Sequence, residues 1–157
     1  MATIEFETTI NAPLAKVWEF YQDVQASLPV LSDPRDEVRI ESVDVPPRVG
    51  GKLVLHAKGP LGRVKWVAIY SEIVPPHAVV FGEEARFVDV QESGPFKTWK
   101  HRHEFEVVDA KTTRMIDRIA YSVGMGPIGW VADKLLIRPR LRRMFGYRRE
   151  VLAKLFG

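Results

Sequence analysis

Residues 127–156, close to the C-terminus, constrain the fold of the chain most, because they carry the pattern of one long amphipathic helix. Pro127 suits the first turn of such a helix, and Pro139 should kink or split it, since its ring removes a backbone hydrogen bond. A helix of this length cannot bury its apolar stripe against itself, so the preceding residues should form a sheet that receives it. Apolar residues recur at steps of three and four, at Ile128, Val131, Ala132, Leu135, Leu136, Leu141, Met144, Phe145, Val151, Leu152, Leu155 and Phe156.

The beginning of the chain predicts one strand and two short helices. Residues 3–10 alternate between apolar and polar side chains, which is typical of a half-buried strand. Asn11, Ala12 and Pro13 indicate the cap and first turn of a short helix. A second short helical segment is expected at 24–31, where prolines 29 and 34 set its limit.

From residue 37 to residue 123 the pattern changes to the two-residue period of strands. Short breaks rich in proline and glycine separate the segments, so successive strands should pair antiparallel. Strands are expected at 37–43, 52–58, 63–74, 78–83, 97–108 and 112–123. The chain, 1–157, is therefore predicted to be a single α+β domain. Its curved antiparallel sheet of about seven strands wraps around the long C-terminal helix.

This order of elements resembles the helix-grip fold of the START-like, or SRPBCC, superfamily, which includes the birch pollen allergen. The run Ile10-Asn11-Ala12-Pro13, followed by Val17-Trp18, is similar to the first strand and helix of that superfamily. The chain also resembles a bacterial branch of the superfamily that is described as polyketide cyclase/dehydrase-like. The residues that carry this resemblance are Gly94-Pro95-Phe96, Trp99, His101, His103, Phe105, Asp117, Tyr121, Gly126-Pro127 and residues 147–150. The resemblance covers essentially the whole chain. It implies a cavity for a lipid-like or polyketide-like molecule.

Composition narrows the chemistry. The chain has no cysteine, which excludes disulfides and thiolate chemistry. No apolar run reaches membrane-spanning length, and the first residues lack the order of a signal peptide, so a cytoplasmic location is expected. A net charge of +3 does not by itself indicate a nucleic-acid partner, and none is expected.

One polar cluster is expected inside the apolar sheet face. Alternation along 97–108 places Trp99, His101, His103 and Phe105 on the inward face. On the next strand Asp117 and Tyr121 face inward as well. A tight turn at 110–111 would set Asp117 opposite His103 or Phe105, and Tyr121 or Ile119 opposite His101. The sequence therefore predicts a cluster of His101, His103, Asp117 and Tyr121.

Three interpretations of this cluster stay open. It can be a satisfied internal hydrogen-bond network, a polar anchor in a ligand pocket, or a site of metal binding or acid–base catalysis. A metal needs a third ligand beyond the two histidines. His56 and His77 do not lie on a convergent face, and Asp117 is the available carboxylate. We expect no resident metal and no cofactor.

Further aromatic residues extend the expected binding wall. Trp66 and Tyr70 share a strand face with the small Ala68, which can leave room for a ligand, although all three can equally be plain core. Leu135 represents the C-terminal helix. The predicted ligand-binding residues are Trp66, Tyr70, Trp99, His101, His103, Phe105, Asp117, Tyr121 and Leu135.

The expected function is binding or transport of a hydrophobic or amphipathic small molecule, with access near residues 59–62 and 94–95 or by movement of the helix about Pro139. One alternative is a cyclase/dehydratase-type enzyme acting on a carbonyl-rich substrate, so enzymatic activity stays open. The other is an interaction protein that uses its basic helix. Arg138, Arg142 and Arg143 would then contact an anionic membrane surface, although arginines on such a helix more commonly form a solvated face.

Overall fold

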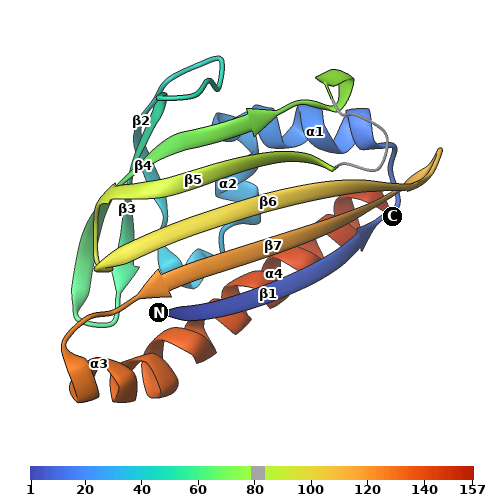
Figure 1. Cartoon of the computed structure of the whole chain (residues 1–157). Coiled ribbons are helices and arrows are strands. Elements are labelled where there is room, and N and C mark those ends of the chain that lie inside the picture. The colour runs from blue at the N-terminus through green and yellow to red at the C-terminus, as the bar shows by residue number, and fades with distance from the viewer. Residues whose placement is uncertain (79–83) are drawn as a thin grey trace.

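The computed structural model describes residues 1–78 and 84–157, and it has the predicted α+β helix-grip architecture (Figure 1). Seven antiparallel strands form one curved sheet in the order β1-β7-β6-β5-β4-β3-β2. The strands are β1 (Ala2–Ile10), β2 (Arg39–Val43), β3 (Lys52–Gly59), β4 (Gly62–Val74), β5 (Ala85–Ser93), β6 (Thr98–Asp109) and β7 (Thr112–Ser122). Six of them lie within two residues of the predicted bounds.

The strand that lies between β4 and β6 was not predicted. The expected strand 78–83 lies, apart from Ala78 in a 3-10 turn (Pro76–Ala78), outside the described residues. The strand that pairs with β4 and β6 is β5, at Ala85–Ser93. Its inward positions include Phe87 and Asp89. The inward carboxylate of Asp89 interrupts the alternation of apolar and polar residues, so the sequence pattern did not indicate a strand here.

The helices cover the concave side of the sheet. Figure 1 shows the C-terminal helix α4 (Arg138–Phe156) running diagonally behind β1 and β7. The helix α1 (Leu14–Gln22) follows β1, and α2 (Val24–Leu31) has the bounds predicted for it. A single 3-10 turn (Pro34–Asp36) then leads into β2. Pro29 lies inside α2 rather than at its end.

The C-terminal helix is split, as Pro139 predicted. A short helix α3 (Gly126–Ala132) passes through a π-helical turn (Asp133–Ile137) into α4, which has proline in its first turn. The widened turn accommodates the missing N–H and the bulky ring of Pro139.

The apolar stripe is buried only in α4. There Leu141, Phe145 and Leu152 face the sheet. In α3 and the π turn the stripe was expected to be buried, but Ile128 is 73% exposed and Leu135 is 69% exposed. Figure 1 shows the reason, because α3 lies beyond the end of the strands, where no sheet remains to receive it.

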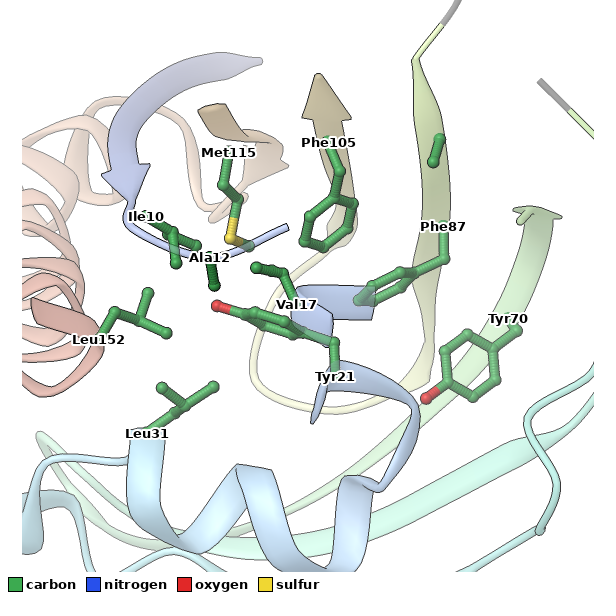
Figure 2. Packing of buried hydrophobic residues seen from close by; sticks show 11 residues of the cluster. Ile10, Ala12, Val17, Tyr21, Leu31, Tyr70, Phe87, Phe105, Met115 and Leu152 are labelled. Carbon is green, nitrogen blue, oxygen red and sulfur yellow. The ribbon is translucent and has the colours of Figure 1, made fainter. Parts of the chain in front are cut away.

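The core has two apolar clusters that flank the middle of the sheet. One cluster is seen from close by in Figure 2, where Tyr21, Phe87 and Phe105 converge with Ile10, Val17, Met115 and Leu152. The other joins Trp99, Ile119 and Tyr121 to Leu141 and Phe145 of α4. Among the residues that the structure describes, no helix is long and apolar enough to cross a membrane.

Candidate functional site

A two-lobed cavity lies between the sheet and the helices α2 and α4. The first lobe has a volume of about 200 Å³ and the second of about 190 Å³. They adjoin, because both are lined by Val38, Ala57, Trp66, Trp99, His101, Met144 and Arg148. The two lobes therefore lie next to each other between the sheet and α4.

The walls of this cavity are mainly apolar. Side chains of α2, β3 and β4 line the first lobe, including Leu31, Leu55 and Ile69. The second lobe is bounded by Pro60 and Pro95, from the two loops expected to give access, together with residues of the π turn and α4. Such a surface favours an apolar ligand, since burial contributes roughly 25 cal/mol per Å².

Four polar residues form a closed cluster on the inner wall. The rings of His101 and His103 lie 3.7 Å apart between centroids. Asp117 Oδ1 lies 2.8 Å from His101 Nε2 and 3.0 Å from His103 Nδ1. On the opposite side of the rings, Asp89 Oδ2 lies 3.2 Å from His103 Nε2 and 3.8 Å from His101 Nδ1. Each ring therefore stands between two carboxylates.

Strand register brings these residues together. His103 pairs with Asp117 across β6 and β7, which is one of the two partners predicted for Asp117. His101 pairs with Ile119, which is one of the two partners predicted for His101. Across β5 and β6, Asp89 lies opposite His101. Because opposed residues share a sheet face, all four side chains point into the grip.

The pKa values of the two histidines are shifted in opposite directions. Burial lowers the pKa of His101, and the neighbouring His103 acts in the same direction. Burial also opposes a charge on His103, but Asp117 and Asp89 outweigh it and raise the pKa of that imidazole. The histidines hold the pKa of Asp117 well below its usual range although burial opposes this. The two carboxylates thus favour the charged form of His103, whereas burial and the neighbouring His103 disfavour the charged form of His101.

Arg148 is a second polar feature of the cavity. It lines both lobes, and its guanidinium lies 4.8 Å from the ring centre of Phe145. Its buried Nε has no hydrogen-bond partner among the described residues. The hydroxyl of Tyr21, which lines the first lobe, also has no hydrogen-bond partner among the described residues. Burial raises the pKa of Tyr21.

Arg148 was not predicted as a site residue, although the sequence carried a signal for its position. Residue 148 lies seven after Leu141, three after Phe145 and four before Leu152, so it shares their buried helix face. Asp89 was missed as well, because its strand was not recognised.

The structure places the nine predicted site residues in different surroundings. Five of them line the first lobe, namely Trp66, Tyr70, Trp99, His101 and His103. Asp117 lies behind the two histidines. The other three predicted residues line neither lobe. Phe105 is fully buried in the apolar core, the hydroxyl of Tyr121 donates to Asp133 rather than to the histidine cluster, and Leu135 is exposed.

Comparisons with solved structures agree on the fold. The Zhui aromatase/cyclase from a Streptomyces species matches with a TM-score of 0.72 at 16% identity, covering 96% of this chain and 90% of that one. A START superfamily protein from Mycobacterium smegmatis matches at 0.67 and 12% identity, covering 98% of each chain. A norcoclaurine synthase from Thalictrum matches at 0.66 and 14% identity, covering 96% and 93%.

No protein-family model and no curated protein matches the sequence. At these identities the structural likeness establishes the architecture alone. The chain therefore has the START-like, or SRPBCC, helix-grip fold that also occurs in aromatase/cyclases, and its function has to be argued from its own cavity.

Proposed function

We propose that this protein binds a hydrophobic or amphipathic small molecule in the two-lobed cavity, with an oxygen-bearing anionic group of that molecule at Arg148. The observation that carries the proposal is the buried, unpartnered Nε of Arg148 between two apolar lobes, as judged over the described residues. A buried donor without a partner costs about 1–3 kcal/mol, and a ligand oxygen would recover that energy.

The lining supports an elongated ligand. Apolar walls on both sides of Arg148 would hold the hydrocarbon part, and Trp66 and Trp99 line both lobes where they meet. The loops at 59–62 and 94–95 are the proposed route of access, because Gly59, Pro60 and Pro95 line the second lobe.

Native mass spectrometry of the freshly purified protein is the first test. A discrete non-covalent adduct, absent after denaturation, would support the proposal and give the mass of the ligand. A bare chain that also fails to bind any member of a series of fatty acids and fatty alcohols would contradict it.

A matched pair of variants tests the anchor. Arg148→Met should weaken dodecanoate binding by about tenfold or more, because hydrogen bonds to charged groups contribute roughly 1.5–3 kcal/mol. Arg142→Met, on an exposed position of the same helix, should bind dodecanoate as the wild type does. If the wild-type protein binds dodecanoate and dodecanol with equal affinity, and the Arg148→Met protein does so as well, Arg148 does not contact the anionic group of the ligand.

The opposite pKa shifts of the two histidines favour one second candidate, a cyclase/dehydratase-type enzyme. A neutral His101 can accept a proton and a charged His103 can donate one to a carbonyl-rich substrate. Such an enzyme would show a bell-shaped dependence of rate on pH that disappears in His103→Gln. A protein that only binds would show saturation without product.

The third candidate, contact with an anionic membrane, needs a different surface from the one first expected. Arg143 pairs with buried Asp33 and Asp36, and Arg138 pairs with Asp133, so these two arginines act within the molecule. An apolar patch is exposed instead, at Met125, Ile128, Trp130, Val131, Leu135 and Leu136.

The chemistry of this patch suits a lipid interface. Trp130 is 60% exposed and carries Lys134 over its ring at 4.0 Å, a pairing of aromatic and basic groups that favours anionic headgroups. In a vesicle-sedimentation assay, Trp130→Ala should reduce binding to phosphatidylglycerol vesicles. Val107→Ala, close to the C-terminal end of β6, should not. Equal binding by all three proteins would contradict membrane contact through this patch.

A further inference from the structure

We propose that Asp89, His101 and His103 form a binding site for a divalent transition-metal ion, such as Zn²⁺ or Fe²⁺, on the wall of the first lobe. One possible ligand atom from each residue lies within 4.8 Å of the others. The three side chains are between 7% and 19% exposed. Two imidazoles and one carboxylate are the ligand set of many sites that keep open positions for a substrate or water.

The distances fit a single ion. Metal–nitrogen and metal–oxygen bonds of about 2.0–2.2 Å place neighbouring donors roughly 3–4 Å apart. Asp89 Oδ2 lies 3.2 Å from His103 Nε2 and 3.8 Å from His101 Nδ1. Both separations are in the required range, and all three ligand atoms lie within 4.8 Å of one another.

Asp117 gives an independent reason to regard this as a metal site. Histidines that bind metals usually donate their second ring N–H to a carboxylate, which fixes the ring and its tautomer. Here Asp117 Oδ1 faces His101 Nε2 at 2.8 Å and His103 Nδ1 at 3.0 Å. The hydrogen bond to His101 fixes that ring and leaves its Nδ1, the nitrogen nearest Asp89, available as a ligand. The contact with His103 Nδ1 is a close ionic contact, because this nitrogen has no hydrogen-bond partner among the described residues.

Charge balance and access point the same way. With both imidazoles neutral, Asp89 and Asp117 carry two negative charges in the interior, and a divalent cation would neutralise them. Asp89, His101 and His103 all line the first lobe, so the remaining coordination positions would face the cavity. A water or a ligand oxygen would occupy them.

The site could not be assembled from the sequence, where a third ligand was missing and Asp117 was the available carboxylate. The ligand is Asp89 of β5, and Asp117 is a positioning residue behind the rings.

Metal titration of the full-length protein tests the site directly. After dialysis against EDTA, the chain is titrated with Co²⁺, followed by its visible absorption, and with Zn²⁺ by calorimetry. We expect one equivalent of ion per chain. Asp89→Asn should weaken binding by at least about tenfold, and Asp117→Asn by roughly 10–100-fold. The control His56→Gln alters an exposed histidine paired with Glu41, and it should bind as the wild type does.

The absence of one-to-one binding in the wild type would overturn the proposal. Unchanged affinity in Asp89→Asn, or an equal loss in His56→Gln, would overturn it as well. Circular dichroism of the metal-free proteins checks that each variant folds. Asp89→Asn is the main test variant, because Asp89 has the least buried side chain of the three ligands and its substitution disturbs the fold least. Since the probe is the ion alone, failure here would leave the organic-ligand proposal standing.

Discussion

Single polar residues in the interior determine how neighbouring elements are joined. Thr113, at the start of β7, is fully buried, and its hydroxyl donates to the backbone oxygen of Ala12 at 2.8 Å. This bond ties β7 to the segment that leads from β1 into α1. A buried backbone oxygen has no alternative partner in water, so the contribution of Thr113 exceeds that of a surface threonine.

Thr113→Val should therefore lower the free energy of unfolding by about 1–3 kcal/mol, because the oxygen of Ala12 would lose its donor without a change of side-chain shape. Urea unfolding followed by fluorescence measures the effect. The matched variant Thr98→Val, on an exposed position of β6, should change stability by about 0.5 kcal/mol or less. A Thr113→Val protein as stable as the wild type would show that the bond is dispensable.

For single residues, the sequence was informative where a position depends only on residues close to it in the chain. Alternation and a tight turn predicted His103 or Phe105 as the residue opposite Asp117, and the register shows that it is His103. They were not enough for Asp89 or Arg148. The first depends on which strand pairs with β6, and the second depends on how α4 is rotated against the sheet.

Between elements, buried ion pairs and aromatic contacts hold α4 in the grip. Arg143 donates to Asp33 and Asp36, which frame the 3-10 turn before β2, at 2.6 Å to each. On the other side of the helix contact, Phe145 stacks on Phe6 of β1 with ring centres 4.4 Å apart. The helix is thus attached to both edges of the sheet.

The acid sensitivity of the Asp33 contact follows from its pKa. The hydrogen bond from Arg35, with Arg143 nearby, lowers the pKa of Asp33 to about 2. Since this is below the usual value of about 3.9, the contact stabilises the fold above pH 4 and loses its effect as pH falls towards 2. Asp33→Asn should unfold more easily at pH 7, by roughly 1.5–3 kcal/mol, and should show a flatter loss of stability between pH 4 and 2.

Chemical unfolding across that pH range measures both effects. Glu19→Gln, at an exposed position of α1, is the control and should retain the wild-type profile. An Asp33→Asn protein with an unchanged acid limb would mean that other carboxylates determine acid unfolding.

The stacked Phe145 leads to a second prediction for the helix. Phe145→Ala should cost about 3–5 kcal/mol, because the side chain is only 6% exposed and its removal leaves a void against β1. Leu155→Ala, at the 50% exposed end of α4, should cost less than about 1 kcal/mol. Calorimetric melting distinguishes the two, and similar losses for both would contradict the assigned helix face.

For the whole molecule, the important property is that the grip is not completely filled. Buried residues therefore differ in whether they face the cavity or only packed core, and several core residues, such as Tyr70, Phe87 and Trp99, also line the cavity. Ala68 and Ala12 illustrate the difference. Both are nearly fully buried, but Ala68 lines the first lobe whereas Ala12 lies in a packed cluster.

Ala68→Leu should therefore change the free energy of unfolding by less than about 1 kcal/mol, since the new side chain enters open space. The same change at Ala12 should cost about 1–3 kcal/mol through overpacking. Ala68→Leu should also weaken dodecanoate binding by about tenfold, which fluorescence titration would show. A large loss of stability in Ala68→Leu would mean that the first lobe collapses in solution.

The sequence by itself determined the elements and their order, because strand alternation, helical spacing and the effects of proline act over a few residues. Six strands, α1, α2 and the break at Pro139 follow from such local rules. Only the tertiary structure decided which inward residues meet a cavity, which lie in packed core, and which part of the apolar stripe has no sheet to cover it. Those outcomes depend on strand register and helix docking, where residues far apart in the chain come together in space.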